Sequence, residues 1–352
     1  MKKLKKSTVN NIISFGIVII AFIICQSMIA SGAMKRSLRG QMVPICVYIV
    51  MAISLNLVVG ISGELSLGHA GFMSIGAFSG IIAATWLNAV FSIESELLQL
   101  ILAMVIGGVF AGIAGVLIGI PVLRLRGDYL AIVTLAFGEI IRNVLNCLYF
   151  SLDGKRLHVS FNNPNIPGTV LVNGPAGATV ANKIATFPVG FALIIFTLIV
   201  VMNLINSRSG RAIMATRDNR IAAEAMGINV TKYKMMAFVT AAVLAGMAGA
   251  LYGLNFSTVA ASKFKFDTSI LVLVFVVLGG IGNIWGSIIA AALLTVLPEL
   301  LRTFADYRML VYAIVLILVM LVTNNPMLRS LFSQLARRRG REAQTQVGGA
   351  DE

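Results

Sequence analysis

Long apolar runs are the feature that most constrains the fold of this chain. They recur from near residue 12 to about residue 323, and most are close to 20 residues long. A helix needs about 20 apolar residues to cross a hydrocarbon core of about 30 Å. The chain is 58% hydrophobic and only 12% charged, whereas about a quarter of an ordinary soluble domain is charged. The pattern predicts an all-α, polytopic membrane protein.

About ten of these runs are predicted to span the membrane, within a range of eight to ten. The range reflects two glycine-rich regions, residues 65–88 and 268–301, which can be broken or re-entrant. We expect residues 1–330 to form one transmembrane domain, followed by a basic, flexible tail at 331–352. The predicted spans are residues 12–31, 43–60, 65–88, 97–121, 129–150, 187–206, 235–254, 268–282, 284–301 and 308–323.

The distribution of positive charge predicts the orientation. Most of the 28 Lys and Arg residues gather at the N-terminus, around Arg124, in residues 207–234 (the basic segment) and in the C-terminal tail. The positive-inside rule makes these regions cytoplasmic, both termini included. The loop at 35–39 departs from the rule. Because membrane topology explains the net charge of +14, we expect no nucleic-acid partner.

The N-terminus has two interpretations. A lysine-rich start followed by an apolar run fits a signal peptide cleaved near residues 30–33, and it also fits an uncleaved first helix. We favour the uncleaved helix.

Residues that carry catalytic or metal chemistry are scarce. Cys25, Cys46 and Cys147 each stand alone within an apolar run, and the chain has only two histidines. We therefore expect neither a disulfide nor a metal site. The sequence also does not offer the paired nucleophile and base that an intramembrane enzyme would need.

The basic segment contains a short predicted helix. Asp218 can cap its start, and Gly227 provides a left-handed stop. Arg220 and Glu224 are four residues apart and can form an ion pair worth a few tenths of a kcal/mol. The apolar residues of this helix share one face, and they are Ile221, Ala222, Ala225 and Met226. So short a helix is marginal in water, so we expect it to pack against something.

Several spans carry small residues at four-residue spacing. Gly108 and Gly112 form one such pair, and Ala245, Gly249 and Gly253 form a longer row. Such faces let helices approach closely in lipid. Internal packing and a dimer interface both fit, and internal packing is the interpretation we favour.

Ionisable side chains inside membrane spans usually face a cavity or a partner. Glu139 and Arg142 lie three residues apart and can pair. The glycine-rich stretch that contains Glu64, Ser66 and His69 predicts a loosely wound start to a helix, which is tolerated only where it is buried or lines water. Free amides there can hold an anionic group. Glu64, Ser66, His69 and Glu139 can therefore border a translocation path. The alternative for His69 is that it is a buried, hydrogen-bonded packing residue.

The loop at 152–186 is polar, rich in proline and predicted to be external. Its length suggests a function, and we leave open whether it docks an external partner or merely connects two spans.

Several motifs together resemble a known family. Glu224 to Ile228, EAMGI, resembles the core of the EAA loop in permeases of ATP-binding cassette (ABC) importers. Residues 60–78, GISGELSLGHAGFMSIGAF, resemble the pattern of branched-chain amino acid permeases. Residues 126–142, 207–238 and 278–286 resemble the LivM-type member of the permease pair in the same order. The resemblance covers about residues 42–325.

The resemblance implies an ABC importer permease, closer to the type II arrangement, in the cytoplasmic (inner) membrane of a bacterium. It implies that Asp218, Arg220, Ile221, Glu224, Ala225 and Gly227 belong to the loop that couples to the ATPase. The implied partners are a second homologous permease subunit, two ABC ATPase subunits and an extracytoplasmic substrate-binding protein. ATP and Mg²⁺ would be bound by the ATPase subunits, because this chain has no phosphate-binding loop and is not expected to be an enzyme.

The resemblance points to leucine, isoleucine and valine as substrates, with urea or short amides as the alternative. From a different class of protein, an ion-coupled secondary transporter remains open. It would use a titrating carboxylate in the core, for which Glu139 and Glu64 are the candidates.

Overall fold

The structure is a computed structural model. It describes residues 36–301 except for 92–94, 126, 155, 164–166 and 181–182, together with scattered residues within 23–31 and 307–317. The chain divides into two units, residues 1–296 and 297–352. The helices and strands that follow belong to the first unit, except for the last turn of its final helix.

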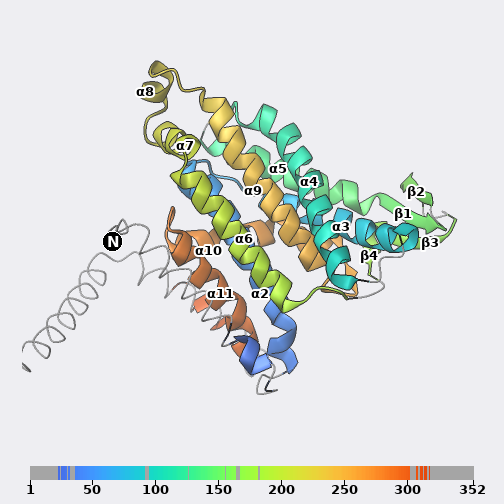
Figure 1. Ribbon diagram of the computed structural model, residues 1–352. Helices are drawn as coiled ribbons and strands as arrows, with labels where there is room; N and C mark the ends of the chain where they lie inside the picture. The colour runs from blue at the N-terminus through green and yellow to red at the C-terminus, as the bar shows by residue number, and fades with distance from the viewer. Residues whose placement is uncertain are drawn as a thin grey trace, which may run out of the picture. The chain divides into compact units, whose positions relative to one another are not determined.

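Five of the described helical segments are long and apolar enough to cross a membrane (Figure 1). They are α2 (Arg36–Asn56) with the π-helical turn η1 (Leu57–Ile61), α3 (His69–Phe91), α4 (Glu96–Val122), α6 (Phe187–Asn206) and α9 (Val230–Gly253). Three further helices in the apolar regions are α5 (Asp128–Asn146), α10 (Phe266–Gly279) and α11 (Ile284–Leu300). The expected helical membrane architecture is confirmed. The total of about ten spans stays a prediction, since the segments at 12–31 and 308–323 lie largely outside the described residues.

Helix α9 lies at the centre of the packing and contacts α2, α3 and α4. Small residues make this possible. A Cβ atom added at Gly246 would overlap Ala111 and the Gly107 carbonyl on α4, and one added at Gly249 would overlap the Met73 carbonyl on α3. Backbones this close maximise packing contacts, which are the main drive for helix association in lipid. The faces predicted from four-residue spacing are thus used for internal packing.

A small antiparallel sheet lies at one end of the helices (the sheet-bearing end). The sequence did not predict this sheet. Its strands are β1 (Leu148–Asp153), β2 (Arg156–Phe161), β3 (Thr169–Asn173), β4 (Gly177–Thr179) and β5 (Thr258–Val259), in the order β2-β1-β3-β4-β5. The turn η2 (Gly174–Ala176) joins β3 to β4.

The sheet corrects two expectations. The apolar run predicted as a span to residue 150 leaves the helix at Asn146, and the region 152–186, expected as a loop, contains the end of β1 and strands β2, β3 and β4. Tyr149 and Phe150 favour a strand, and Gly154, with φ +58°, forms the tight turn between β1 and β2. Because β5 follows α9 directly, the sheet joins distant parts of the sequence.

Two short helices occupy the opposite end of α9 from the sheet. They are α7 (Arg208–Asp218) and α8 (Arg220–Ala225), and α8 is followed closely by Val230, the first residue of α9 (Figure 1). On the sheet side, η3 (Ala261–Phe264) leads from β5 into α10.

Candidate functional site

Three side-chain caps fix the path of the basic segment. The hydroxyl of Ser207 accepts a hydrogen bond from the Gly210 amide at 3.0 Å. The side-chain oxygen of Asn219 accepts a hydrogen bond from the Ala222 amide in α8 at 3.0 Å, and that of Asn229 accepts one from the Lys232 amide in α9 at 3.1 Å. Each bond satisfies an amide that has no partner within its own helix.

The cap predicted at Asp218 is wrong by one residue. Asp218 is the last residue of α7, and Asn219, with extended backbone angles, caps α8. The reason is that the basic segment forms two helices rather than one, so the non-helical residue between them takes the capping role.

The remaining predicted features of α8 are present in the structure. Arg220 donates to Glu224 at 2.9 Å. Gly227 has φ +78°, in the left-handed region, and the Ile228 amide donates back to the Ala223 carbonyl at 3.0 Å. This backbone closure is typical of a glycine-terminated helix.

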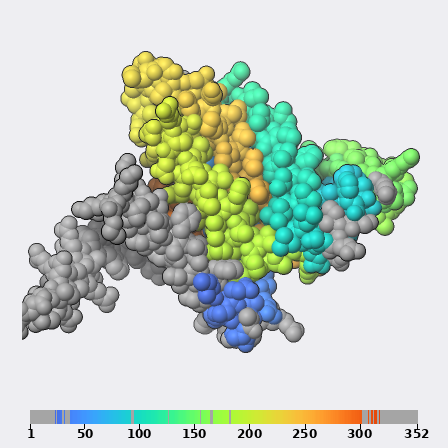
Figure 2. Space-filling view, viewed as in Figure 1, coloured from blue at the N-terminus to red at the C-terminus, as the bar shows by residue number. Residues whose placement is uncertain are grey.

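The apolar face of α8 is uncovered. Ile221 is 80% exposed and Met226 is 82% exposed, and Ala222 and Ala225 are exposed beside them. Only Ala223 is buried against the rest of the chain. In the space-filling view α7 and α8 form the yellow end of the molecule (Figure 2). Apolar side chains gathered on a protruding helix favour contact with another protein.

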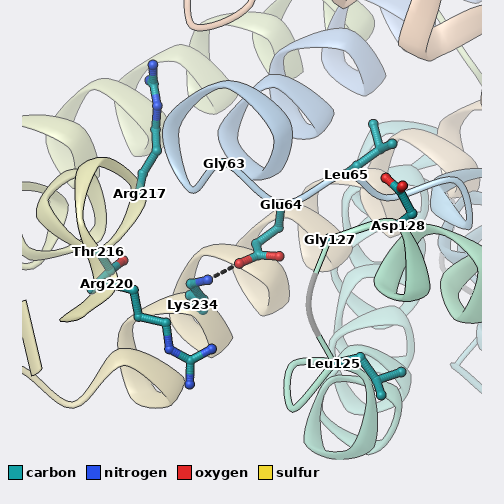
Figure 3. A pocket seen from close by; sticks show the side chains of 10 residues that line it. All are labelled: Gly63, Glu64, Leu65, Leu125, Gly127, Asp128, Thr216, Arg217, Arg220 and Lys234. Carbon is teal, nitrogen blue, oxygen red and sulfur yellow. Dashed lines mark hydrogen bonds and ion pairs between the residues drawn. The ribbon is translucent and has the colours of Figure 1, made fainter.

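A polar pocket of about 310 Å³ lies beside α7 and α8 (Figure 3). Its walls come from the stretch after η1, the loop between α4 and α5, α7, α8 and α9. It is lined by Gly63, Glu64, Leu65, Leu125, Gly127, Asp128, Thr216, Arg217, Arg220 and Lys234. It therefore brings the sequence-predicted residues Glu64 and Arg220 to one place.

Two basic residues at this pocket hold the chain around Glu64. The ammonium of Lys234 on α9 forms an ion pair with the Glu64 carboxylate, and each side chain is only 11% exposed. The guanidinium of Arg217 on α7 donates to the Gly60 carbonyl at 2.6 Å. Neither contact was foreseen, because 170 residues separate Glu64 from Lys234 and 157 separate Gly60 from Arg217.

Residues 62–68, between η1 and α3, form a break in the helical structure (the first break). The expected loosely wound segment is present there. The Leu67 amide donates to the Thr134 hydroxyl on α5 at 3.0 Å, and the Ala70 amide donates to the Ser269 hydroxyl on α10 at 3.1 Å. Side chains of neighbouring helices thus satisfy backbone groups that lipid would leave unpaired.

The polar side chains of the first break differ in their surroundings. His69 is buried and its Nε2 lies 2.8 Å from the Ser54 hydroxyl, in agreement with the packing interpretation. The hydroxyls of Ser62 and Ser66 are buried, and neither has a hydrogen-bond partner among the described residues. Buried polar atoms are usually paired, so both are candidates to meet a ligand.

Glu139 lies on α5 and pairs with Arg142 at 2.7 Å, as predicted. It does not line the polar pocket. Its neighbour Gly138 packs against Gly68, where an added Cβ would be 3.3 Å from the Gly68 Cα. Glu139 therefore lies on the helix that supports the far end of the first break.

A second break, residues 280–283 between α10 and α11, meets the first. The Gly282 amide donates to the Asn56 side-chain oxygen at 2.9 Å, and a Cβ at Gly60 would overlap the Gly282 backbone. Sequence inspection showed only that both regions are rich in glycine. It gave no signal that they touch.

Broken helices that bring polar groups together among long apolar spans are typical of polytopic membrane transport proteins. The family described as the branched-chain amino acid transport system permease component matches residues 38–320. The chain therefore belongs to this family.

Relatives agree with this assignment. The chain is 34% identical over 309 residues to the high-affinity branched-chain amino acid transport system permease protein LivM of Escherichia coli (strain K12), and 33% identical to LivM of Salmonella typhimurium. Each match covers 78% of this chain and 66% of the relative, so the chain spans slightly less than two thirds of their length.

A second type of relative is the permease protein LivH of the same Salmonella strain. It is 35% identical over 118 residues, which covers 33% of this chain and 38% of LivH. No solved structure matches the chain at a significant level.

Proposed function

We propose that this chain is the permease subunit of an ABC importer that moves branched-chain amino acids across the cytoplasmic membrane. The observation that carries the proposal is the uncovered apolar face of α8, with Ile221 and Met226 more than three-quarters exposed. It lies on a helix bordered by Gly227 and by the Arg220–Glu224 pair. A short, rigidly capped apolar face of this kind suits docking into a groove of an ATPase subunit.

The proposed assembly has four further subunits. They are two ATPase subunits that bind ATP and Mg²⁺, a second permease of similar fold, and an extracytoplasmic binding protein with its substrate. LivM and LivH relatives of one bacterium both match this chain, which supports pairing with a second, homologous permease. Docking at α8 would make the α7–α8 end cytoplasmic and the sheet-bearing end external. The basic residues near both termini favour a cytoplasmic position for the termini as well.

The proposed translocation path borders the first break and α5. Ser66 offers a buried hydroxyl that no described group uses, and Glu64, His69 and Glu139 lie on or beside the same segment. Charged groups within a membrane are tolerated where they face a water-filled cavity or a second subunit. The Glu139–Arg142 pair remains partly exposed in the single chain, at 32% and 22%, which supports a position facing one of these.

The ion pairs weigh against the ion-coupled transporter. Such a carrier needs a carboxylate that is free to titrate, yet Glu64 pairs with Lys234 and Glu139 pairs with Arg142. For the substrate, the printed function of the LivM relatives favours branched-chain amino acids over urea or short amides.

Cysteine crosslinking tests the docking directly. In a chain with Cys25, Cys46 and Cys147 replaced, Ala225→Cys should crosslink to the ATPase subunit in membranes. Val159→Cys, exposed on β2 at the sheet, is the matched control and should not. Glu224→Lys combined with Gly227→Val should reduce both ATPase co-purification and leucine uptake in proteoliposomes. Failure of Ala225→Cys to capture an ATPase, together with normal uptake by the double variant, would refute the proposal.

A further inference from the structure

We propose that Arg217 and the Glu64–Lys234 ion pair are positioning residues, which transmit movement of α8 to the two breaks in the membrane helices. The inference rests on the proposed function, because it assumes that a docked ATPase subunit moves α8. It adds the route by which that movement reaches the membrane segment.

The two breaks form a single junction. Asn56, at the end of α2, accepts a hydrogen bond from the Gly282 amide of the second break. Gly60 and Gly282 lie backbone against backbone, with no room for a side chain at Gly60. Displacement of either break therefore displaces the other, because packed backbones cannot interpenetrate.

Arg217 ties α7 to this junction. Its guanidinium donates to the Gly60 carbonyl at 2.6 Å, and the aliphatic part of its side chain lies against Gly63, where an added Cβ would be 2.7 Å from its Cγ. A charged donor to a carbonyl at a helix end makes a strong hydrogen bond. Arg217 also immediately precedes the Asp218–Asn219 corner from which α8 begins, so the two move together.

Lys234 ties α9 to the same stretch from the other side of the polar pocket. It lies in the second turn of α9, a few residues after the end of α8, and pairs with Glu64 in a largely buried setting (Figure 3). Ion pairs sheltered from water are strong, and losing one partner leaves an uncompensated charge. The two helices that flank α8 therefore both bind residues 60–64: α7 binds the Gly60 carbonyl and α9 binds the Glu64 carboxylate.

The pocket supplies room for movement. It separates part of α7 and α8 from the loop between α4 and α5, so it leaves space on that side into which these helices can move. Residues 62–68 lead from this pocket to Thr134 and His69, and they carry the Ser62 and Ser66 hydroxyls, which have no hydrogen-bond partner in the part of the chain that the structure describes. A shift at α8 would therefore reposition the segment proposed to border the path.

The first test separates coupling from assembly. Arg217→Gln removes the charged donor, and Arg211→Gln on the same helix is the matched control, because the guanidinium of Arg211 donates to the nearby Asn206 carbonyl, at 3.4 Å. We expect Arg217→Gln to keep ATPase co-purification and basal ATP hydrolysis, and to lower leucine transported per ATP about tenfold, the effect of losing one charge-assisted hydrogen bond. Arg217→Lys should restore part of the transport, because an ammonium group can still donate. Arg211→Gln should match the wild type.

The second test is a charge-swap cycle that holds even if Arg217→Gln is not recovered as an intact complex. Glu64→Lys and Lys234→Glu should each lower transport per ATP, and the double variant should recover about half or more of it, because opposite charges again face each other.

A third readout is the thiol reactivity of Ser66→Cys, which should change when the ATPase is trapped with vanadate and should stop changing in Arg217→Gln.

The outcomes distinguish the two proposals. If Ala225→Cys captures the ATPase but Arg217→Gln transports like Arg211→Gln and the charge swap gives no recovery, the positioning role is wrong and the docking stands. If Ala225→Cys captures no ATPase and the variant with Glu224→Lys and Gly227→Val takes up leucine normally, both proposals fall.

Discussion

The side-chain amide of Asn56 donates a hydrogen bond to the hydroxyl of Ser287 at 2.9 Å, although 231 residues separate them. The Ser287 hydroxyl in turn donates to the Asn283 carbonyl at 3.1 Å, and the Asn56 oxygen accepts from the Gly282 amide. One buried asparagine therefore holds the first turn of α11, the second break and the end of α2 in register.

Asn56→Leu should destabilise the chain. It removes the hydrogen bonds to the half-buried Gly282 amide and to the buried Ser287 hydroxyl, which still donates to the Asn283 carbonyl. An amide left unsatisfied costs about 1–3 kcal/mol. The measurement is the midpoint of thermal unfolding in detergent, followed by size-exclusion chromatography. Asn206→Leu is the control, because Asn206 is exposed and its amide donates to the Met202 carbonyl one turn away. Equal midpoints for the two variants would contradict the bridging role.

Gly246→Leu should prevent α9 from packing against α4. Even a Cβ at this position would overlap Ala111 and the Gly107 carbonyl, and overpacking a close helix contact costs about 1–3 kcal/mol or more. Gly40→Leu provides the control, because an added Cβ there meets nothing within 4 Å. We expect little monodisperse Gly246→Leu protein and near-normal yield of Gly40→Leu. A normal yield of both would show that the interface tolerates larger residues.

Gly227→Ala should loosen α8 without a steric clash. No atom lies within 4 Å of the added Cβ, so the cost arises from the backbone alone, at φ +78°. That cost is about 1–2 kcal/mol for a residue with a Cβ, and Gly227→Asn should show less. Hydrogen exchange of the amides at 223–228 should accelerate in Gly227→Ala and change little in Gly227→Asn. Unchanged exchange in both would mean that the left-handed residue does not control the end of α8.

Ser66→Ala and His69→Ala should have opposite signatures. The Ser66 hydroxyl has no described partner, so its removal should leave stability unchanged or slightly increased, while uptake shows a higher KM if the hydroxyl meets the substrate. His69→Ala breaks the contact with Ser54 and should lower stability. Unchanged uptake by both variants would remove the first break from the proposed path.

Neutralising Glu139 alone should be worse than neutralising the pair. Glu139→Gln leaves the Arg142 charge without its carboxylate, whereas Glu139→Gln with Arg142→Gln removes both charges. We expect the single variant to accumulate less in membranes than the double variant, as measured by immunoblotting of membrane fractions. The reverse order would indicate that the two charges do not depend on each other.

The sequence predicted features that depend on local patterns. Apolar length identified the spans that became α2, α3, α4, α6 and α9, and small-residue spacing identified the packing faces. Gly227 and the Arg220–Glu224 pair were also predictable, because a left-handed stop and a four-residue ion pair depend on neighbours along the chain.

Features that depend on distant contacts were not predictable. Nothing in the sequence around Glu64 points to Lys234, and the carbonyl of Gly60 carries no sequence signal for Arg217. The sheet was missed for a related reason. Its first strand continues an apolar run, so hydrophobic length alone favoured a longer α5.

The strand that follows α9 restricts how that helix can move. β5 is hydrogen-bonded to β4, and β1 of the same sheet begins directly after α5. As long as these strand pairs persist, the ends of α5 and α9 nearest the sheet cannot slide past each other. A displacement applied near Val230 would then be resisted most at the strands. The largest excursions would occur far from the sheet, at the level of Lys234 and the polar pocket, and the smallest at the sheet itself.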